Sequence, residues 1–211
     1  MQIKILKKDD ISEKLKTRSL YEKNFDIGDI DYIDYYYEVI IKRNEIVVLL
    51  DNSDNIISMV HLNPYLYNIL GDEQLVHYFV AIATDTKYRK MGYMNKVLSV
   101  AFDYLYSLRE PFCFTMPIDS NIKKIYEKQG FDVICPFNIN KFSNEKYDIF
   151  PIRNDEFEML MRNEQKFLDK ETDEYILSLS KKEIMFKILY SNNIKSLDDL
   201  RNKNIYVCQE V

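Results

Sequence analysis

The chain has 211 residues, of which 46% are apolar and 30% are charged, and its formal net charge is -5 at neutral pH. A chain of this length can bury enough surface to fold without disulfides or a bound metal. Its 29 basic residues are outnumbered by 34 acidic ones, which argues against a nucleic-acid partner because phosphate binding favours basic proteins. Three widely spaced cysteines and only four glycines exclude a disulfide framework, a zinc ribbon and the glycine-rich nucleotide folds.

The sequence predicts neither a membrane anchor nor a secretion signal. Charged residues break up the apolar ones at the N-terminus, so the apolar core of a signal peptide is missing. The longest uncharged run, residues 56–71, contains histidine, asparagine and proline and falls short of the ~20 residues that span a bilayer. We therefore expect a cytoplasmic protein without a membrane partner.

The first part of the chain predicts helices followed by strands. Apolar residues recur at helical spacing over 9–16 and 29–42. Residues 46–50 and 56–62 are β-branched apolar runs joined by turn-forming Asp, Asn and Ser, so they predict an antiparallel hairpin. Residues 75–84 are apolar on both faces, which is typical of a central strand in a covered sheet.

The middle of the chain predicts a basic loop, two helices and a short strand. Residues 85–91 are polar and basic, and a helix is expected to begin at Gly92. An apolar strand over 112–116 precedes a second helix, for which Asp119 is a good N-cap residue. Gly130 should end that helix at the C′ position. The alternation of strands and helices indicates the α/β class.

After residue 146 the sequence predicts mainly helices. The expected elements are helices over 155–169 and 172–190, a short helix after the capping residue Ser196 and a last strand over 205–208. We place one domain boundary here, which gives a first domain of residues 1–146 and a helical C-terminal extension of residues 147–211.

The segment that carries chemistry is a strand, a basic loop, a glycine and a helix over residues 82–94. A helix N-terminus presents unpaired N–H groups and a partial positive charge, which together bind phosphate. Gly92 would let the backbone approach a pyrophosphate closely, and Arg89 and Lys90 would add charge-assisted hydrogen bonds. The spacing matches neither the P-loop nor the Rossmann glycine pattern.

This segment resembles the pyrophosphate loop of the GNAT superfamily of acyl-CoA-dependent N-acetyltransferases, [RQ]-x-x-G-x-[GA]. The matching residues are Arg89, Lys90, Met91, Gly92, Tyr93 and Met94, the last of which replaces a small residue. The family's later Tyr-x-x-x-Gly-Phe is matched by Tyr126 to Phe131, and Asp119 stands where these enzymes often have Asn. The resemblance implies a GNAT-like fold, with a mixed and mainly antiparallel central sheet flanked by helices, to which the helix-rich C-terminal segment is added.

A narrower likeness concerns residues 58–65, 80–94 and 111–117. They look like the N-terminal domain of the enhanced-intracellular-survival type of acetyltransferase, and the likeness covers roughly residues 1–145. Members of that type are longer and carry a second GNAT-like region. Residues 147–211 are therefore alternatively a truncated second region of that kind.

The resemblance also implies roles for individual residues. An acetyl group would pass from acetyl-CoA, the co-substrate, directly to a primary amine, without a metal. The backbone groups that would face the pantetheine arm belong to Ile82, Ala83 and Thr84, and residues 89–94 would hold the pyrophosphate. Tyr126 would stand near the sulfur as the general acid, a role that contributes on the order of 10² to 10⁴ in rate.

The general base is left open by the sequence. A lysine-like amine has a pKa of ~10.4, so a base must remove its proton at neutral pH. The candidates are His61, Glu73, Asp85 and the C-terminal carboxylate of Val211. His61 also fits a structural role, because it lies in a strand pattern.

Two other functions remain open. The departures at Met94 and Asp119 permit a catalytically inactive domain that binds acyl-CoA as a sensor or interaction module. The acidic, helix-rich region after residue 146 also permits an α/β interaction domain without a ligand. For an active enzyme, the negative net charge favours a cationic acceptor, either a small molecule or a lysine side chain. A homo-oligomer is left open.

Overall fold

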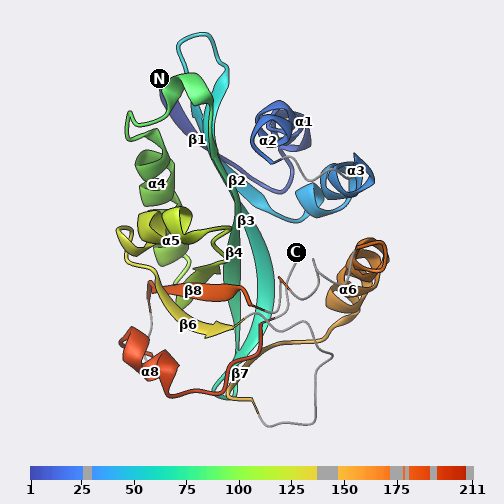
Figure 1. Cartoon of the computed structure of the whole chain (residues 1–211), viewed down its shortest axis with the longest axis vertical. Helices are drawn as coiled ribbons and strands as arrows, with labels where there is room; N and C mark the ends of the chain where they lie inside the picture. The colour runs from blue at the N-terminus through green and yellow to red at the C-terminus, as the bar shows by residue number, and fades with distance from the viewer. Residues whose placement is uncertain (26–29, 137–146, 172–177, 179–180, 191–193, 208–211) are drawn as a thin grey trace. The chain divides into compact units, whose positions relative to one another are not determined.

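The two long strands β3 (Ile56–Ile69) and β4 (Asp72–Thr84) are neighbours in the sheet of the computed structural model (Figure 1). The structure describes residues 1–25, 30–136, 147–171, 178, 181–190 and 194–207. Contacts divide the chain into two compact units. The first unit comprises Met1–Pro64 and Phe79–Leu108, and the second comprises Tyr65–Tyr78 and Arg109–Val211. Both β3 and β4 therefore contribute to each unit.

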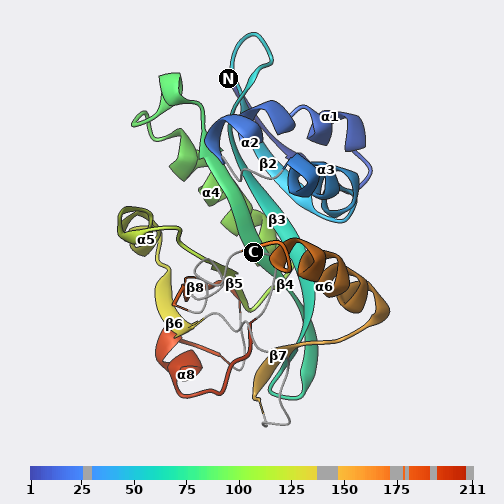
Figure 2. The same cartoon turned by 45° about the vertical axis from the view of Figure 1, so that its right-hand side comes forward.

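The first unit is a layer of antiparallel strands with helices on both faces. Its strands follow the order β1, β2, β3, β4. Helices α1 to α3 lie on one face of these strands and α4 lies on the other (Figures 1 and 2). Besides its parts of β3 and β4, its elements are β1 (Gln2–Leu6), α1 (Ile11–Leu15), α2 (Arg18–Asn24), α3 (Ile30–Glu38), the 3-10 helix η1 (Ile40–Lys42), β2 (Glu45–Leu50), the 3-10 helix η2 (Thr86–Tyr88) and α4 (Tyr93–Ser107).

Helices on both faces explain why the strands of this unit are apolar on both sides. Ile46 and Val47, which are neighbours on β2 and point to opposite faces, are both fully buried. The apolar stripe of α4 is buried as its spacing predicted, with Leu98 and Leu105 fully inaccessible. The predicted hairpin of β2 and β3 is confirmed, and the Asp51 carboxylate shapes its turn by accepting hydrogen bonds from two backbone N–H groups further along the turn.

The second unit holds a mixed sheet in the order β3, β4, β5, β8, β6, with β7 paired to β3. Strands β4 and β5 are parallel, whereas β8 runs antiparallel to both β5 and β6. Its further elements are β5 (Phe112–Thr115), α5 (Ser120–Glu127), β6 (Asp132–Pro136), β7 (Ile149–Pro151), α6 (Asp155–Leu168), β8 (Glu183–Ile188) and α8 (Leu197–Arg201). The expected fold class, a mixed and mainly antiparallel sheet flanked by helices, is confirmed.

The C-terminal helix predicted over 172–190 is wrong where it meets β8. Ile184, Met185 and Phe186 are consecutive and all buried, a pattern that a strand covered on both faces shares with a buried helix. Residues 183–188 form a strand because they pair with β5 on one side and β6 on the other. Residues 172–177 and 179–180 lie outside the described part of the chain.

Three smaller differences concern short elements. Strand β1 was not expected, although Gln2 and Lys4 alternate with Ile3 and Ile5 as in a half-exposed edge strand. The region expected as one helix over 29–42 ends as α3 at Glu38 and continues as the separate 3-10 helix η1. In place of a last strand over 205–208, the structure shows an isolated bridge between Ile149 and Ile205, and Cys208 lies outside the described residues.

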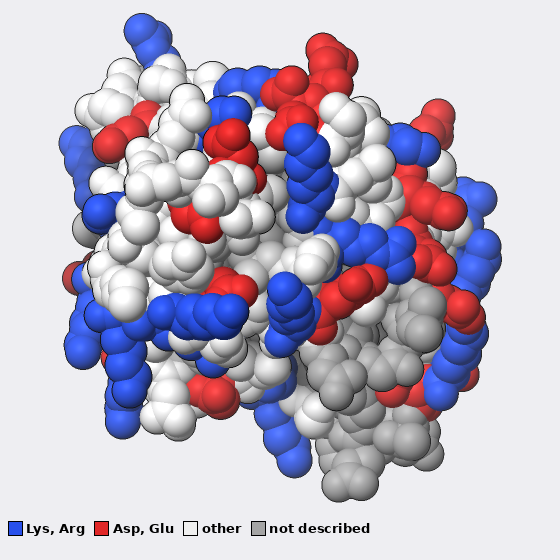
Figure 3. Space-filling model, turned by 90° about the horizontal axis from the view of Figure 1, so that it is seen from above, with Lys and Arg blue, Asp and Glu red and all other residues white. Residues whose placement is uncertain are grey.

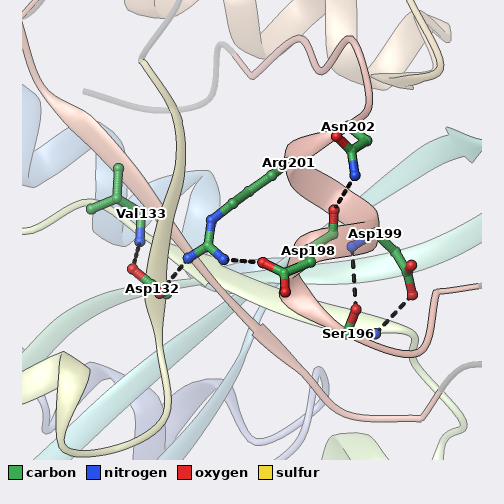
Figure 4. A network of polar contacts seen from close by, with 7 residues as sticks. All are labelled: Asp132, Val133, Ser196, Asp198, Asp199, Arg201 and Asn202. Carbon is green, nitrogen blue, oxygen red and sulfur yellow. Dashed lines mark hydrogen bonds and ion pairs between the residues drawn. The ribbon is translucent and has the colours of Figure 1, made fainter.

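Helix α8 is joined to β6 by a small polar network (Figure 4). The side chain of Ser196 accepts a hydrogen bond from the N–H of Asp199, whose carboxylate accepts one from the N–H of Ser196. Arg201 pairs with Asp198 on its own helix and with Asp132 at the start of β6. Helix α8 is therefore capped by its own residues and joined to β6, a strand that lies far from it in the sequence.

The limits of the two compact units differ from the expected boundary near residue 146. Strand β8, from the later part of the chain, lies in the sheet between β5 and β6. The expected limits of an acyl-CoA-binding domain, residues 1–146, stay a prediction. In the described part of the chain, no helix is long and apolar enough to cross a bilayer.

Candidate functional site

The predicted phosphate-binding segment lies in the first unit and begins at an irregular point of β4. Ala81 has a φ of 50°, a left-handed conformation inside a strand. Such a residue interrupts regular pairing and is typical of a β-bulge, a feature often found beside active sites. Ile82, Ala83 and Thr84 follow this irregularity directly, at the end of the strand.

Two of the three residues expected to face a pantetheine arm already have protein partners. The Ser58 hydroxyl donates to the Ala83 carbonyl at 3.1 Å and lies 2.9 Å from the Thr84 hydroxyl. The carbonyl of Thr84 accepts from Nε of Arg89 at 3.2 Å. These contacts fix the backbone at the end of β4. They also place Ser58, the first residue of the narrower likeness over 58–65, in this region.

Gly92 opens α4 as predicted, and it does so in a conformation that favours glycine. Its φ is 77°, and Lys90 two residues earlier is also left-handed, with a φ of 64°. A Cβ at Gly92 would meet no protein atom within 4 Å, so the space beside this backbone is open. Left-handed residues at such turns are typical of the concave backbone arrangements that bind anions.

The N-terminus of α4 is suited to an anionic ligand. Its N-cap residue makes no side-chain capping bond, and its first turn contains no acidic residue. The N–H groups of this turn have no intrahelical partner, and the helix dipole favours a negative charge there. Met91 and Gly92 are exposed, while Tyr93 and Met94 are half-buried, so this end of the helix faces solvent.

Arg89 connects the loop to a helix that the sequence had not linked with it. Its Nη2 donates to Oδ1 of Asn24, the last residue of α2, at 2.6 Å, while its Nε donates to Thr84. The guanidinium is thus oriented by two protein groups and remains exposed to solvent. Lys90 is also exposed. Basic and acidic side chains are intermixed among the described residues of the face drawn in Figure 3.

The other predicted site residue, Tyr126, lies in the second unit near the end of α5. Asp119 caps this helix by accepting hydrogen bonds from the N–H groups of Asn121 and Ile122. At the other end, Phe131 N–H donates to the Tyr126 carbonyl at 3.2 Å, and Gly130, with a φ of 84°, turns the chain. This is a Schellman arrangement, in which Gly130 occupies the C′ position that the sequence predicted. The rings of Tyr126 and Phe131 are 5.9 Å apart, centre to centre.

The phenol of Tyr126 is buried and keeps its proton. Burial raises its pKa to about 12, and the charge of Asp119 acts in the same direction. A hydrogen bond with the Thr115 side chain, on β5, partly opposes this shift. Tyr126 is therefore protonated throughout the physiological range, which is the state that a general acid requires. Sequence patterns gave no indication of Thr115, because the contact depends on how α5 packs on β5.

The candidate bases are placed differently from one another. Asp85 accepts a hydrogen bond from the N–H of Lys87 at 3.0 Å and so caps η2. Glu73 is exposed on β4 in the second unit. Val211 lies outside the described residues.

His61, the remaining candidate, is fully buried in the first unit. Its Nδ1 lies 3.0 Å from the hydroxyl of Tyr36, and its Nε2 has no hydrogen-bond partner among the described residues. The rings of Tyr36 and Tyr21 pack around the imidazole. Burial, with the charge of Lys14 as a smaller cause, lowers the pKa of His61 to about 3. An imidazole in this state is a weak proton acceptor, which favours a structural role for it.

No group of three or more metal-ligating side chains is found within the described ranges. The arrangement offers two sets of groups: a positively polarised helix N-terminus, and a protonated phenol held by its neighbours. Each set lies within its own unit.

The fold is similar to that of known acetyltransferases. An Escherichia coli GNAT family N-acetyltransferase solved with CoA is 14% identical, with 98% of this chain and 87% of that one covered at a TM-score of 0.56. The ribosomal-protein-S18-alanine N-acetyltransferase from E. coli is 11% identical, with 92% and 97% covered at a TM-score of 0.55. At such identities the likeness shows the fold alone.

A probable N-acyltransferase from Enterococcus faecalis V583 is also similar, at 15% identity and a TM-score of 0.53. The alignment covers 63% of this chain and 32% of that one, so this chain matches about a third of that protein's length. A comparison with curated proteins finds no match. The family model described as an acetyltransferase (GNAT) domain matches residues 2–134, more than half of the sequence. The chain therefore belongs to the GNAT acetyltransferase family.

Proposed function

We propose that this protein transfers an acetyl group from acetyl-CoA directly to a primary amine. The observation that carries the proposal is the N-terminus of α4, where the left-handed Gly92 leaves open space and supplies no capping side chain. Membership of the GNAT family implies acyl transfer from acyl-CoA. The acetyl donor, the amine acceptor and the resemblance to the enhanced-intracellular-survival type are part of the proposal.

The loop would bind the pyrophosphate through backbone and side-chain groups. N–H groups of residues 92–94 point from a helix N-terminus, where a favourable anion contact is typically worth ~0.3 to 1 kcal/mol. Arg89 adds a guanidinium that Asn24 and Thr84 already orient, so less conformational freedom is lost on binding. Ile82, Ala83 and Thr84 would line the path of the pantetheine arm, downstream of the irregularity at Ala81.

Acetyl-CoA would supply an acyl thioester, whose thiolate leaves when the amine attacks the carbonyl carbon. Tyr126 would protonate that thiolate. In the proposed step the Thr115 hydroxyl donates to the phenol oxygen of Tyr126, which accepts. The phenol proton then remains available for the leaving sulfur. The negative net charge of the chain favours a cationic acceptor, such as a polyamine, an aminoglycoside or a lysine side chain.

The proposal is tested with a panel of such amines and acetyl-CoA, following the release of free thiol. We expect turnover with at least one amine, and a Tyr126→Phe variant should lose on the order of 10² to 10⁴ in rate if the phenol is the acid. Full turnover by that variant would remove the acid role alone. A folded protein that shows no thermal shift with millimolar acetyl-CoA would refute the proposed function.

Gly92→Val tests the phosphate loop, and Gly71→Val is its matched control. Both glycines have positive φ, and a Cβ at either one would meet no protein atom within 4 Å. The two substitutions should therefore strain the backbone similarly, whereas only a side chain at position 92 would obstruct the ligand. We expect a loss of acetyl-CoA affinity of tenfold or more for Gly92→Val alone, measured by calorimetry. Equal affinities in the two variants would contradict this assignment.

A catalytically inactive acyl-CoA-binding domain is the second candidate. The placements of His61, which is buried, and Asp85, which caps η2, favour it because neither residue is positioned as an obvious base. Tight binding of CoA without thiol release across the whole panel would support this candidate, and transfer to any amine would exclude it.

A further inference from the structure

Strand β8 brings a lysine to the end of the helix that carries Tyr126. Nζ of Lys187 donates to the carbonyl oxygen of Gln129 at 2.7 Å, and Lys187 is half-buried. On its other side, β8 pairs with β5, where Lys187 lies opposite Cys113. Because β8 is hydrogen-bonded to strands on both sides, the sheet fixes the position of the Lys187 backbone.

The absence of a side chain at Gly130 leaves room for the ammonium group at its present position. A Cβ at Gly130 would lie 2.7 Å from Nζ of Lys187. The same glycine adopts the left-handed φ that lets Phe131 return its N–H to the Tyr126 carbonyl. Gly130 thus meets two requirements at once, since it ends the helix and admits the cation.

A cation at this position suits the electrostatics of the helix. The last carbonyl groups of a helix have no intrahelical partner and carry a partial negative charge. Lys187 supplies a charged donor to the carbonyl of Gln129, three residues after Tyr126. With the Asp119 cap at the start and Thr115 at the phenol, α5 is held at both ends and Tyr126 at its hydroxyl.

Two other lysine contacts join the α5 region to the segment around β8, but they lie away from Tyr126. Lys123, on the first turns of α5, forms an exposed ion pair with Glu183. Lys182 donates an exposed hydrogen bond to the carbonyl of Ile118 before the helix. The contact of Lys187 is at the C-terminal end, where Tyr126 is located, and it is partly shielded from solvent. Loss of this contact should therefore affect the phenol more than loss of the exposed pair.

We propose that Lys187 is a positioning residue for Tyr126, through which the C-terminal part of the chain holds the general acid in place. The inference rests on the proposed function, in which Tyr126 protonates the leaving thiolate. It gives residues 183–188 a role in the active site although they lie far from both GNAT motifs in the sequence. Lys187 acts through the backbone of the helix end, with no contact to the reacting atoms required of it.

The first test replaces Lys187 by Met, which keeps an unbranched apolar stem and removes the charged donor. We expect kcat to fall about tenfold, because a misplacement of the order of 1 Å can cost up to ~10² in rate. The KM for acetyl-CoA should stay within twofold, since the phosphate loop belongs to the other unit. Lys187→Arg should recover most of the rate. Lys123→Met, which removes the exposed contact between α5 and β8, should keep full turnover.

The second test combines Lys187→Met with Tyr126→Phe. If Lys187 acts through the phenol, the substitution should have little further effect on kcat once the phenol is absent. An equal loss in both backgrounds, or a rise in KM without a change in kcat, would overturn the proposal. Full turnover by Tyr126→Phe alone would instead show that the acid role is wrong, and so separates failure of the proposed function from failure of this inference.

If Lys187→Met does not fold, a second variant that retains the lysine still tests the proposal. Gly130→Ala places a Cβ 2.7 Å from the present position of Nζ, so it should displace the ammonium group and lower kcat in the same way, with circular dichroism confirming the fold. Full kcat in folded Gly130→Ala, together with crystallographic evidence that Nζ has left the Gln129 carbonyl, would also overturn the proposal.

Discussion

Two glycines in this chain are required for different physical reasons. Gly92 and Gly130 both have positive φ, but the space around them differs. Beside Gly92 there is open space, which suits a ligand, whereas beside Gly130 there is the ammonium group of Lys187. A side chain at the first position would obstruct binding from outside, and one at the second would displace a group of the protein itself. The scarcity of glycine in the sequence made both positions conspicuous, and the structure distinguishes their roles.

The buried His61 should make the fold sensitive to acid. Its pKa is about 3 in the folded protein, against an ordinary value near 6.5, chiefly because burial disfavours the charged imidazolium. Below pH 6.5 His61 binds a proton in the unfolded chain but stays neutral in the folded chain. The contribution of His61 to stability is therefore complete above pH 6.5 and falls as the pH decreases toward 3, by up to about 1.4 kcal/mol per pH unit.

A His61→Asn variant checks this dependence, since asparagine can still bond to the Tyr36 hydroxyl from the position of Nδ1. Urea unfolding of the variant and the natural chain at pH 7, 6, 5 and 4 gives the difference between the two free energies of unfolding. That difference should shrink as the pH falls, because the variant lacks the titrating group. A difference that stays constant from pH 7 to 4 would show that the imidazole does not resist protonation.

Residues whose role depends on local pattern were predictable, and those that depend on packing were not. Gly92 follows a basic loop and precedes a helical repeat, so its position was visible in the sequence. Thr115 and Lys187 act on Tyr126 or its helix from other strands, and nothing within a few residues of either signals this. The left-handed conformation of Ala81 could not be predicted either, because alanine is common in regular strands.

At the scale of elements, α8 shows how a short helix is stabilised by its own first turn. A five-residue helix is too short to be stable alone, so the capping box of Ser196 and Asp199 and the packing of Leu200 must maintain it. The cap satisfies N–H groups that the helix leaves unpaired.

Ser196→Ala should open α8 locally without unfolding the rest of the chain. Removal of an N-cap hydroxyl typically costs about 1 kcal/mol. Hydrogen exchange at the Leu200 amide should therefore speed up roughly fivefold, by the conversion of 1.4 kcal/mol to a factor of ten. Asp198→Asn is the control, because it weakens the exposed pair with Arg201 and leaves the cap intact. Equal acceleration in both variants would mean that the cap has no special importance.

Strand β8 was wrongly predicted as helix because its conformation is decided by pairing with distant strands and not by its own sequence. A short apolar run bounded by lysines fits a buried strand and a buried helix equally well, and only its partners decide. Strand β4 was predictable, since its run is longer and lies between clear turn signals. The same contrast explains why the GNAT motifs were recognised while the strand that supports the tyrosine helix was assigned to an extension.

For the whole molecule, the division into two units separates the groups of the proposed reaction. The loop expected to hold the pyrophosphate belongs to the first unit, and the tyrosine expected to protonate the thiolate belongs to the second. Strands β3 and β4 contribute to both, so each unit is built from segments that are discontinuous in the sequence. The mixed sheet flanked by helices follows from the alternation of elements, whereas this division does not.

The place of β8 in the sheet has a consequence for the order in which the chain can fold as it is synthesised. Strands β5 and β6 are complete by residue 136, yet the strand that pairs with both begins only at residue 183. While the intervening residues are being added, two strands have open edges that another chain could pair with. Completion of the second unit must therefore wait for contacts between distant parts of the sequence, which form slowly. A ribosome stalled before residue 183 should hold a nascent chain that is prone to aggregate, and one stalled well beyond residue 188 should not.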